Sequence, residues 1–180
     1  MSSKIIEKFI VDMLKTEMEI PNDNVWIYSQ NRKIPDNADG LYANVGMIYS
    51  KIMSSKSYYR DYDDKEIQEV LECCSVQINI MSYDNSARDR RNEVLMALNS
   101  FYAIELMNKE QFRINDIPSS FVNTSSVFGG SELNVFSIVV KCFFTTRKVK
   151  GTSYYDTFSI ETHQQNTTTT QVDTIHAGGV

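Results

Sequence analysis

The side chains best suited to metal chemistry are three aspartates close together in the sequence. Asp61, Asp63 and Asp64 carry carboxylate oxygens, the ligands that hard divalent cations prefer. Two cations, Arg60 and Lys65, flank this group, and the spacing is not that of an EF-hand loop. We therefore expect a solvated acidic loop in preference to a metal site.

A second set of carboxylates supports a catalytic hypothesis. Glu69, Glu72 and Asp84 would serve a small metal-dependent hydrolase or nuclease if a cleft brought them together. Glu69 and Glu72 follow a strand-like pattern, for which a surface position is the simpler interpretation. His163 and His176 lie near the C-terminus, and no phosphate-binding glycine loop, HExxH or GxSxG motif is present. The sequence therefore favours a protein that is not an enzyme, with no catalytic, metal-binding or cofactor-binding residues.

A basic turn is a candidate contact for DNA or for an acidic partner protein. Arg147, Lys148 and Lys150 follow a long apolar run and precede Gly151. Side chains of this type usually contact phosphates when they bind nucleic acid. The formal net charge of −5 argues against a dedicated nucleic-acid binder but allows a local basic patch. Plain solvation of the turn is the alternative interpretation.

A tyrosine-rich segment is the second candidate for a contact surface. Tyr58, Tyr59 and Tyr62 lie in the polar stretch 54–65, which we expect to be a hairpin projecting from a sheet. Tyrosine is enriched where proteins meet, so these residues form a candidate subunit or partner interface. An ordinary exposed hairpin is the alternative.

The composition predicts one soluble domain with a real core. The chain has 180 residues, of which 42% are hydrophobic and 23% charged. Cys73 and Cys74 are adjacent within a strand pattern, so they point to opposite faces, and with Cys142 they are expected to be buried free thiols in a reducing compartment. No signal peptide or membrane-spanning run is visible, and we expect a protein made in the cytoplasm.

The elements that must position these residues follow from hydrophobic periodicity. The period changes from two to 3.6 around residues 83–87, which marks a junction between a strand and a helix. Ser86-x-x-Asp89 resembles a capping box at the start of that helix. We predict helices at 3–18, from 86 to a bend at 99–100, and at about 101–109, and strands at 25–29, 41–53, 67–83, 112–114, 133–146 and 154–162.

The strand at 67–83 contains an irregularity. The apolar residues Ile67, Leu71 and Cys73 are odd-numbered, whereas those from Cys74 to Ile80 are even-numbered. A β-bulge near Cys73–Cys74 would absorb this change, because a slip of one residue turns every side chain to the other face. The alternative is that residues 66–72 form a separate element.

These elements predict an α+β fold. We expect a mixed, mostly antiparallel sheet with helices packed on one face and a long projecting hairpin, all within one domain at residues 1–162. Residues 163–180 are low in complexity and hold little apolar material, so we expect them to be disordered in the free protein. Such a tail can still become ordered on a neighbouring subunit.

The order of these elements and two stretches of sequence resemble the tailed-phage neck and tail-terminator proteins, of the phage neck terminator type. The most specific stretch is V-Q-I-N-I-x-S-Y-D-x-x-A at residues 76–87. The loop before Tyr42 is similar to the family's N-x-x-x-P…G-x-Y pattern through Asn31, Pro35 and Gly40, with one proline where the family often has two. The resemblance covers about residues 4–160, and none of its motifs is catalytic.

The resemblance implies a structural protein of the virion. Such α/β subunits form a ring, usually a hexamer, that caps the tail tube and joins it to the head–tail connector. The implied partners are other copies of the chain, the tail tube protein, the connector, the sheath of a contractile tail and, transiently, genome DNA in the lumen. Assembly would take place in the host cytoplasm, without a membrane. Another tail-completion or tube protein is the alternative, and the small hydrolase or nuclease is a weaker one.

Overall fold

The computed structural model describes residues 3–28, 40–60, 65–128, 131–151, 157–161 and 172–176. The chain divides into two compact units, one of residues 1–57 and 68–148, the other of residues 58–67 and 149–180. The described elements follow the order α1 (Ser3–Met18), the 3-10 helix η1 (Asn22–Asn24), β1 (Val25–Ile27), β2 (Tyr42–Arg60), β3 (Lys65–Ser82), α2 (Ser86–Leu98), α3 (Phe101–Lys109), β4 (Phe112–Asp116), β5 (Val122–Asn123), β6 (Ser126–Phe128), β7 (Ser131–Gly151), β8 (Thr157–Glu161) and β9 (Val172–His176).

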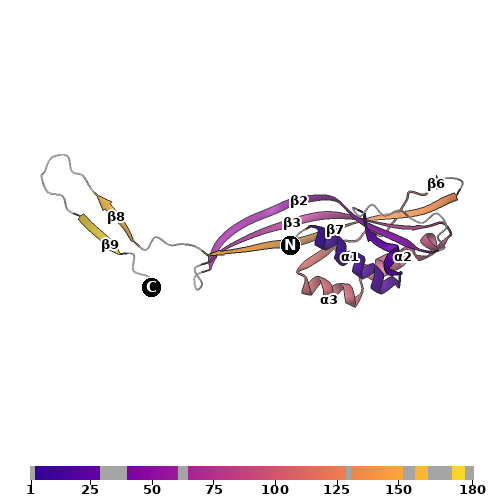
Figure 1. Ribbon diagram of the computed structural model, residues 1–180, viewed down its shortest axis with the longest axis horizontal. Helices are drawn as coiled ribbons and strands as arrows, with labels where there is room; N and C mark the ends of the chain where they lie inside the picture. The colour runs from indigo at the N-terminus through magenta and orange to yellow at the C-terminus, as the bar shows by residue number, and fades with distance from the viewer. Residues whose placement is uncertain are drawn as a thin grey trace. The chain divides into compact units, whose positions relative to one another are not determined.

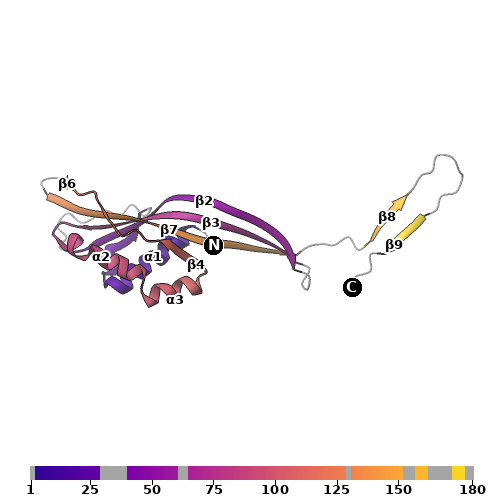
Figure 2. The ribbon, with the colours of Figure 1, turned by 180° about the vertical axis from the view of Figure 1, so that it is seen from behind.

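The first unit is an α+β layer structure, as predicted. Its sheet has the order β1-β2-β3-β7-β4, and the short strands β5 and β6 also pair with β7. β1 runs parallel to β2, whereas β4, β5 and β6 run antiparallel to β7. The helices α1, α2 and α3 lie on one side of the sheet, and no helix of the described residues covers the opposite face (Figures 1 and 2). None of the described helices is long and apolar enough to span a membrane.

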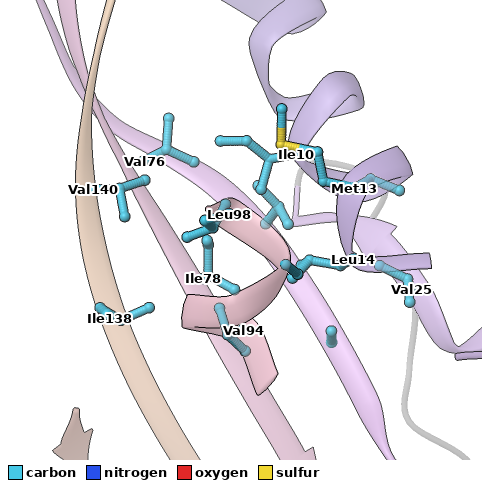
Figure 3. Close-up of a cluster of buried hydrophobic side chains, with 14 of the residues drawn as sticks. Ile10, Met13, Leu14, Val25, Val76, Ile78, Val94, Leu98, Ile138 and Val140 are labelled. Atoms are coloured by element: carbon cyan, nitrogen blue, oxygen red, sulfur yellow. The ribbon is translucent and has the colours of Figure 1, made fainter. Parts of the chain in front are cut away.

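The core lies between this helix layer and the sheet. Even-numbered residues of β3 and β7 and odd-numbered residues of β2 point into it, because side chains alternate along a strand. Each fully buried aliphatic side chain contributes roughly 1.5–3 kcal/mol relative to exposure. Figure 3 shows the two layers meeting through Ile10, Met13, Leu14, Val25, Val76, Ile78, Val94, Leu98, Ile138 and Val140.

A buried carboxylate continues the hydrogen bonding of β2 where its neighbour stops. β1 ends at Ile27, which is paired with Val45, and Met47 lies two residues farther along β2. The backbone N–H of Met47 donates to Oε1 of Glu7 on α1, at 2.7 Å. Glu7 is buried, so this bond gives the strand N–H an acceptor and one carboxylate oxygen a donor, and it ties α1 to β2.

The register of the central strand β3 is regular on one side and irregular on the other. Contacts with β7 recur at equal intervals along both strands: Asn79 with Ser137, Cys74 with Cys142, and Glu69 with Arg147. β3 therefore stays in step with β7.

The contacts of β3 with β2 are spaced unequally. Asn79 bonds to Asn44, whereas Glu72, seven residues earlier on β3, accepts from Ser50, six residues later on β2. Since side chains alternate between faces, the unequal spacing requires a slip of register. The slip lies between β2 and β3, in a stretch that includes the predicted position at Cys73–Cys74, and not between β3 and β7.

The start of α2 differs from the predicted capping box. Asn85 occupies the N-cap position without a side-chain cap bond, and Ser86 is already helical. Instead, Asp84 accepts from the backbone N–H of Ser86 at 2.8 Å, and the Ser82 hydroxyl accepts from that of Ala87 at 2.9 Å. The prediction of a capping box was wrong because Ser82, at the end of β3, and Asp84, just after it, accept the free N–H groups of the first turn.

The C-terminal segment also differs from prediction. The strand expected at 154–162 is β8, but it pairs antiparallel with β9 and does not extend the main sheet. β9, at Val172–His176, lies within residues 163–180, where no strand was predicted. In a hairpin, each strand provides hydrogen-bond partners for the backbone of the other. The composition of the segment does not reveal this pairing.

We expect Glu7→Ala to destabilise the protein by about 1–3 kcal/mol, because it leaves the Met47 N–H without an acceptor. Glu7→Gln keeps an oxygen at the same position and is the matched control, with a smaller loss expected. Urea unfolding of the three proteins measures the difference. Equal losses in both variants would mean that the bond to Met47 does not stabilise the fold.

We expect Asp84→Ala to cost about 1 kcal/mol at neutral pH, because the backbone N–H of Ser86 in the first turn of α2 loses its acceptor. Hydrogen bonds from Ser86 hold the pKa of Asp84 below its ordinary value of 3.8. The stabilisation is therefore complete above that value and disappears as the pH falls through the lowered pKa.

Urea unfolding from pH 7 to pH 2.5 measures this difference between the wild type and Asp84→Ala. Asp89→Ala is the control. Asp89 also lies in the first turn of α2, where its charge interacts favourably with the helix dipole, but none of the described hydrogen bonds involves its side chain. A loss from Asp84→Ala that is the same at every pH would contradict the assignment.

Candidate functional site

The helix-free face of the sheet carries a cluster of uncharged polar side chains. Asn44 comes from β2, Gln77 and Asn79 from β3, and Ser137 from β7. Each lies on the face opposite the core, because its sequence neighbours on the strand are buried among the helices. Thr124, in the connection between β5 and β6, reaches the same place.

Asn79 is the centre of this cluster. Its Oδ1 accepts from Nε2 of Gln77 at 2.7 Å and from Oγ of Ser137 at 2.6 Å, and its Nδ2 donates to Oδ1 of Asn44 at 2.7 Å. The Ser137 hydroxyl also lies 3.3 Å from that of Thr124. One side chain on the central strand thus joins β2 and β7 across β3.

A cavity of about 470 Å³ opens beside the cluster. Both polar and apolar side chains line it, and β2, β3, β7 and two connections contribute to it. The residues that line it are Tyr28, Gly46, Met47, Ile48, Gln77, Asn79, Met81, Thr124, Val135 and Ser137. A second hollow of about 400 Å³ shares Gln77, Thr124 and Ser137 with it.

The close approach of Tyr28 to β2 shapes one wall of the cavity. A Cβ atom placed on Gly46 would lie 2.9 Å from the Cβ of Tyr28, closer than real side chains pack. Glycine at position 46 therefore lets the tyrosine lie against the strand backbone. Tyr28 is 68% exposed, so it forms a rim to the cavity and not part of its floor.

A small aromatic cluster packs against Met81, one of the residues that line the cavity. Trp26 and Tyr42 lie with ring centroids 6.3 Å apart and are buried with Met81, which also lines the cavity. Offset and tilted aromatic pairs of this kind are favourable beyond the area they bury. Trp26, Tyr42 and Met81 are therefore buried together, whereas Tyr28 is exposed.

The side chains that line the cavity are apolar or carry uncharged hydrogen-bonding groups. No charged side chain lines the cavity among the described residues. The amides and hydroxyls are already bonded to one another, and their remaining donors and acceptors suit a neutral polar or apolar group. The described lining residues include no nucleophile paired with a base, which acyl transfer and hydrolysis usually require.

The three candidate catalytic carboxylates do not converge. Glu69 lies 3.5 Å from Arg147, Glu72 accepts from Ser50 at 3.2 Å, and Asp84 bonds to Ser86 at the start of α2. Each carboxylate thus has its own separate partner. Among the described residues, no group of histidine, cysteine, aspartate and glutamate is arranged to hold a metal ion.

None of the predicted contact residues that the structure describes lines this cavity. Arg147 is half exposed, and its charge is shared with Glu69, whereas Lys148 and Lys150 are exposed. Tyr58 is exposed, but the side chain of Tyr59 lies outside the described residues. So do residues 61–64, which include Tyr62 and the aspartates Asp61, Asp63 and Asp64.

The cysteines are free thiols, as predicted. Cys74 and Cys142 are fully buried and lie opposite each other on the core face of β3 and β7, whereas Cys73 is half buried. The hydrogen bond with Cys74, together with burial, raises the pKa of the Cys142 thiol above its ordinary value. This thiol therefore stays protonated and unreactive near neutral pH.

Sequence reasoning missed the polar cluster, although its signal was present. Gln77 and Asn79 alternate with the apolar residues of β3, and that alternation by itself indicates only a polar face. Asn44 and Ser137 lie on distant strands, so only the register brings them to Asn79.

No family model matches the chain, and no curated protein matches it.

We expect Asn79→Val to destabilise the protein by about 1–3 kcal/mol, because Asn44 and Ser137 both lose a partner. Gln77→Val removes a single bond at the edge of the cluster and is the control, with a loss of about 1 kcal/mol or less. Urea unfolding measures both.

A double-mutant cycle of Asn44→Val and Asn79→Val tests the bond directly. The double variant should lose less stability than the sum of the single losses, because each substitution removes the same bond. Strict additivity would show that the two amides are not coupled.

Proposed function

We propose that this chain is a structural subunit of a tailed-phage virion, a tail-terminator or neck protein. It forms a ring with other copies, caps the tail tube and joins it to the head–tail connector. The tube protein, the connector and the sheath of a contractile tail are its proposed partners. This proposal combines the sequence resemblance with the physical character of the subunit's surface.

The observation that carries it is an apolar stretch of β2 beyond the helix layer. Ile48, Tyr49, Ile52 and Met53 are each more than half exposed. By strand alternation, the two isoleucines point to one face and the other two side chains to the opposite face. A strand with large apolar residues exposed on both faces supports a role in assembly, because monomeric proteins rarely expose such patches.

The residues behind the resemblance have structural tasks, which also supports the proposal. Within V-Q-I-N-I-x-S-Y-D-x-x-A, Gln77 and Asn79 belong to the polar cluster, and Asp84 accepts from the first turn of α2. Tyr42 of the second stretch is buried against Trp26. A pattern built from such positions fits a scaffold for assembly better than a catalytic centre.

Exposed basic residues support a secondary part of the proposal, a contact with DNA. Lys148 and Lys150 are exposed, while Arg147 shares its charge with Glu69. A transient contact with genome DNA in the lumen of the ring would use these lysines.

We expect the purified protein to form rings or to bind the ends of tail tubes. Ile52→Asp should weaken this association at least about tenfold, because it buries a carboxylate in the contact. Light scattering measures the mass of the free protein, and electron microscopy with purified tubes measures end binding. Thr16→Asp, at an exposed position of α1, is the control and should assemble like the wild type.

The alternatives give different results in the same experiment. A wild-type protein that remains a monomer and never binds tube ends would contradict the proposed function. Incorporation along the whole tube would indicate a tube protein. Turnover of a nucleic acid or ester that depends on Glu69, Glu72 or Asp84 would indicate an enzyme.

A further inference from the structure

We propose that Cys74 and Cys142 form a disulfide across β3 and β7, within one copy of the chain, when the protein meets hydrogen peroxide. The pair would then be an oxidation-sensitive cross-link in the core. The proposal goes beyond the proposed function and does not depend on it, because it concerns the inside of a single subunit. Both cysteines belong to the same compact unit, residues 1–57 and 68–148.

The register of the sheet places the two cysteines directly opposite each other. The bond between Asn79 and Ser137 lies five residues from them on one side, and the ion pair of Glu69 with Arg147 lies five residues from them on the other. The residue numbers rise along one strand as they fall along the other, so β3 and β7 are antiparallel. The thiols of the two cysteines are hydrogen-bonded to each other, as this register requires.

Such a position allows a disulfide. Directly opposite Cα atoms of an antiparallel pair lie about 4.5 or about 5.5 Å apart, depending on the type of pair. Disulfides usually join Cα atoms that are about 4.4–6.8 Å apart, so both types of pair qualify. Opposite Cβ atoms lie about 4.5–5.5 Å apart and must approach to about 3.8 Å. We therefore expect a bond with some strain, which a reductant breaks readily.

The surroundings leave each thiol of the pair one partner. Cys74 and Cys142 are fully buried, and the next opposite pair on the core face, Val76 with Val140, is aliphatic. Cys73 is half buried and points to the other face of the sheet, because neighbouring side chains alternate along a strand. The Cys73 thiol consequently cannot replace that of Cys74 opposite Cys142 in the folded protein.

The hydrogen bond between the thiols decides which one reacts first. Cys142 donates to Cys74, and this bond lowers the pKa of the Cys74 thiol below its ordinary value while it raises the pKa of Cys142. A thiolate is the form that attacks an oxidant. The first step therefore belongs to Cys74, whereas Cys142 stays protonated and does not attack the peroxide itself.

The reaction balances in two steps. The Cys74 thiolate attacks one oxygen of hydrogen peroxide and the O–O bond breaks, which gives a sulfenic acid on Cys74 and a hydroxide ion. The hydroxide takes up the proton that the Cys74 thiol had released. The sulfur of Cys142 then displaces the sulfenic hydroxyl group, which leaves as water with the proton of Cys142. Two thiols are oxidised to a disulfide, and one peroxide is reduced to water.

Burial makes the first step slow. Neither sulfur of the pair is exposed in the folded protein, so peroxide reaches Cys74 only when the sheet opens locally. The half-buried Cys73 is closer to solvent and should react earlier. The test therefore compares variants that retain only two of the three cysteines.

Cys73→Ser and Cys74→Ser form a matched pair, since each retains Cys142 and one of two adjacent thiols. Peroxide treatment of the folded Cys73→Ser protein should join the peptides that contain Cys74 and Cys142, with the loss of two hydrogen atoms from the intact mass. A reductant should separate the peptides again. The folded Cys74→Ser protein should form no such link. Mass spectrometry of undigested and digested protein measures both.

Unfolding removes the difference between the two variants if the register is its cause. In concentrated urea both proteins should form the link to a similar extent, because Cys73 and Cys74 are adjacent in the chain. If Cys74→Ser does not fold, Cys74→Val replaces it, since the neighbouring core positions of β3 are aliphatic. Circular dichroism shows which variants are folded before oxidation.

The proposal is overturned if folded Cys73→Ser reaches sulfinic or sulfonic acid without forming the link. It is also overturned if the folded variant without Cys74 forms the link equally well, because Cys73 would then reach Cys142. Disulfides between two copies in place of one within a copy would overturn it as well. None of these results bears on the proposed ring, which the assembly experiment tests separately.

Discussion

A sheet covered by helices on only one face must stabilise its other face by different means, and this constraint shapes the whole subunit. The core face of β3 packs against α1 and α2 through aliphatic side chains. No described helix covers the opposite face, so Asn79 bonds there to Asn44 on β2 and Ser137 on β7. Paired amides on a partly exposed face avoid the cost of unsatisfied polar groups and fix the strands laterally. The same arrangement leaves a cavity beside the cluster, because nothing among the described residues fills the space.

The register of β3 is regular against β7 and irregular against β2. Against β7 the strand stays in step from Asn79 to Glu69, which keeps Cys74 and Cys142 together in the core. Against β2 it slips by one residue, close to where β1 ends and Glu7 takes over as acceptor for Met47. The apolar residues of β2 that follow are exposed on both faces. Exposure of this kind is costly for a monomer and useful in an assembly, which links the packing of the sheet to the proposed ring.

Much of the fold followed from periodicity, and the failures have local causes. The change from period two to 3.6 correctly located the junction of β3 and α2, since each period reflects one backbone geometry. The capping box failed because Ser82 and Asp84 at the strand end supply the acceptors instead. The C-terminal hairpin was missed because the low apolar content of residues 163–180 gave no sign that β9 would pair with β8.

The sequence by itself determined the class of the fold, the positions of the three helices and of the longer strands, and the absence of familiar catalytic motifs. Only the tertiary structure decided which polar residues meet. Asn44, Asn79 and Ser137 are far apart along the chain, and a shift of one residue in either strand pairing would turn one of them into the core. The cavity arises in the same way, because it depends on which faces of the sheet and helices remain uncovered after packing, and that is a property of the assembled layers and of no single segment.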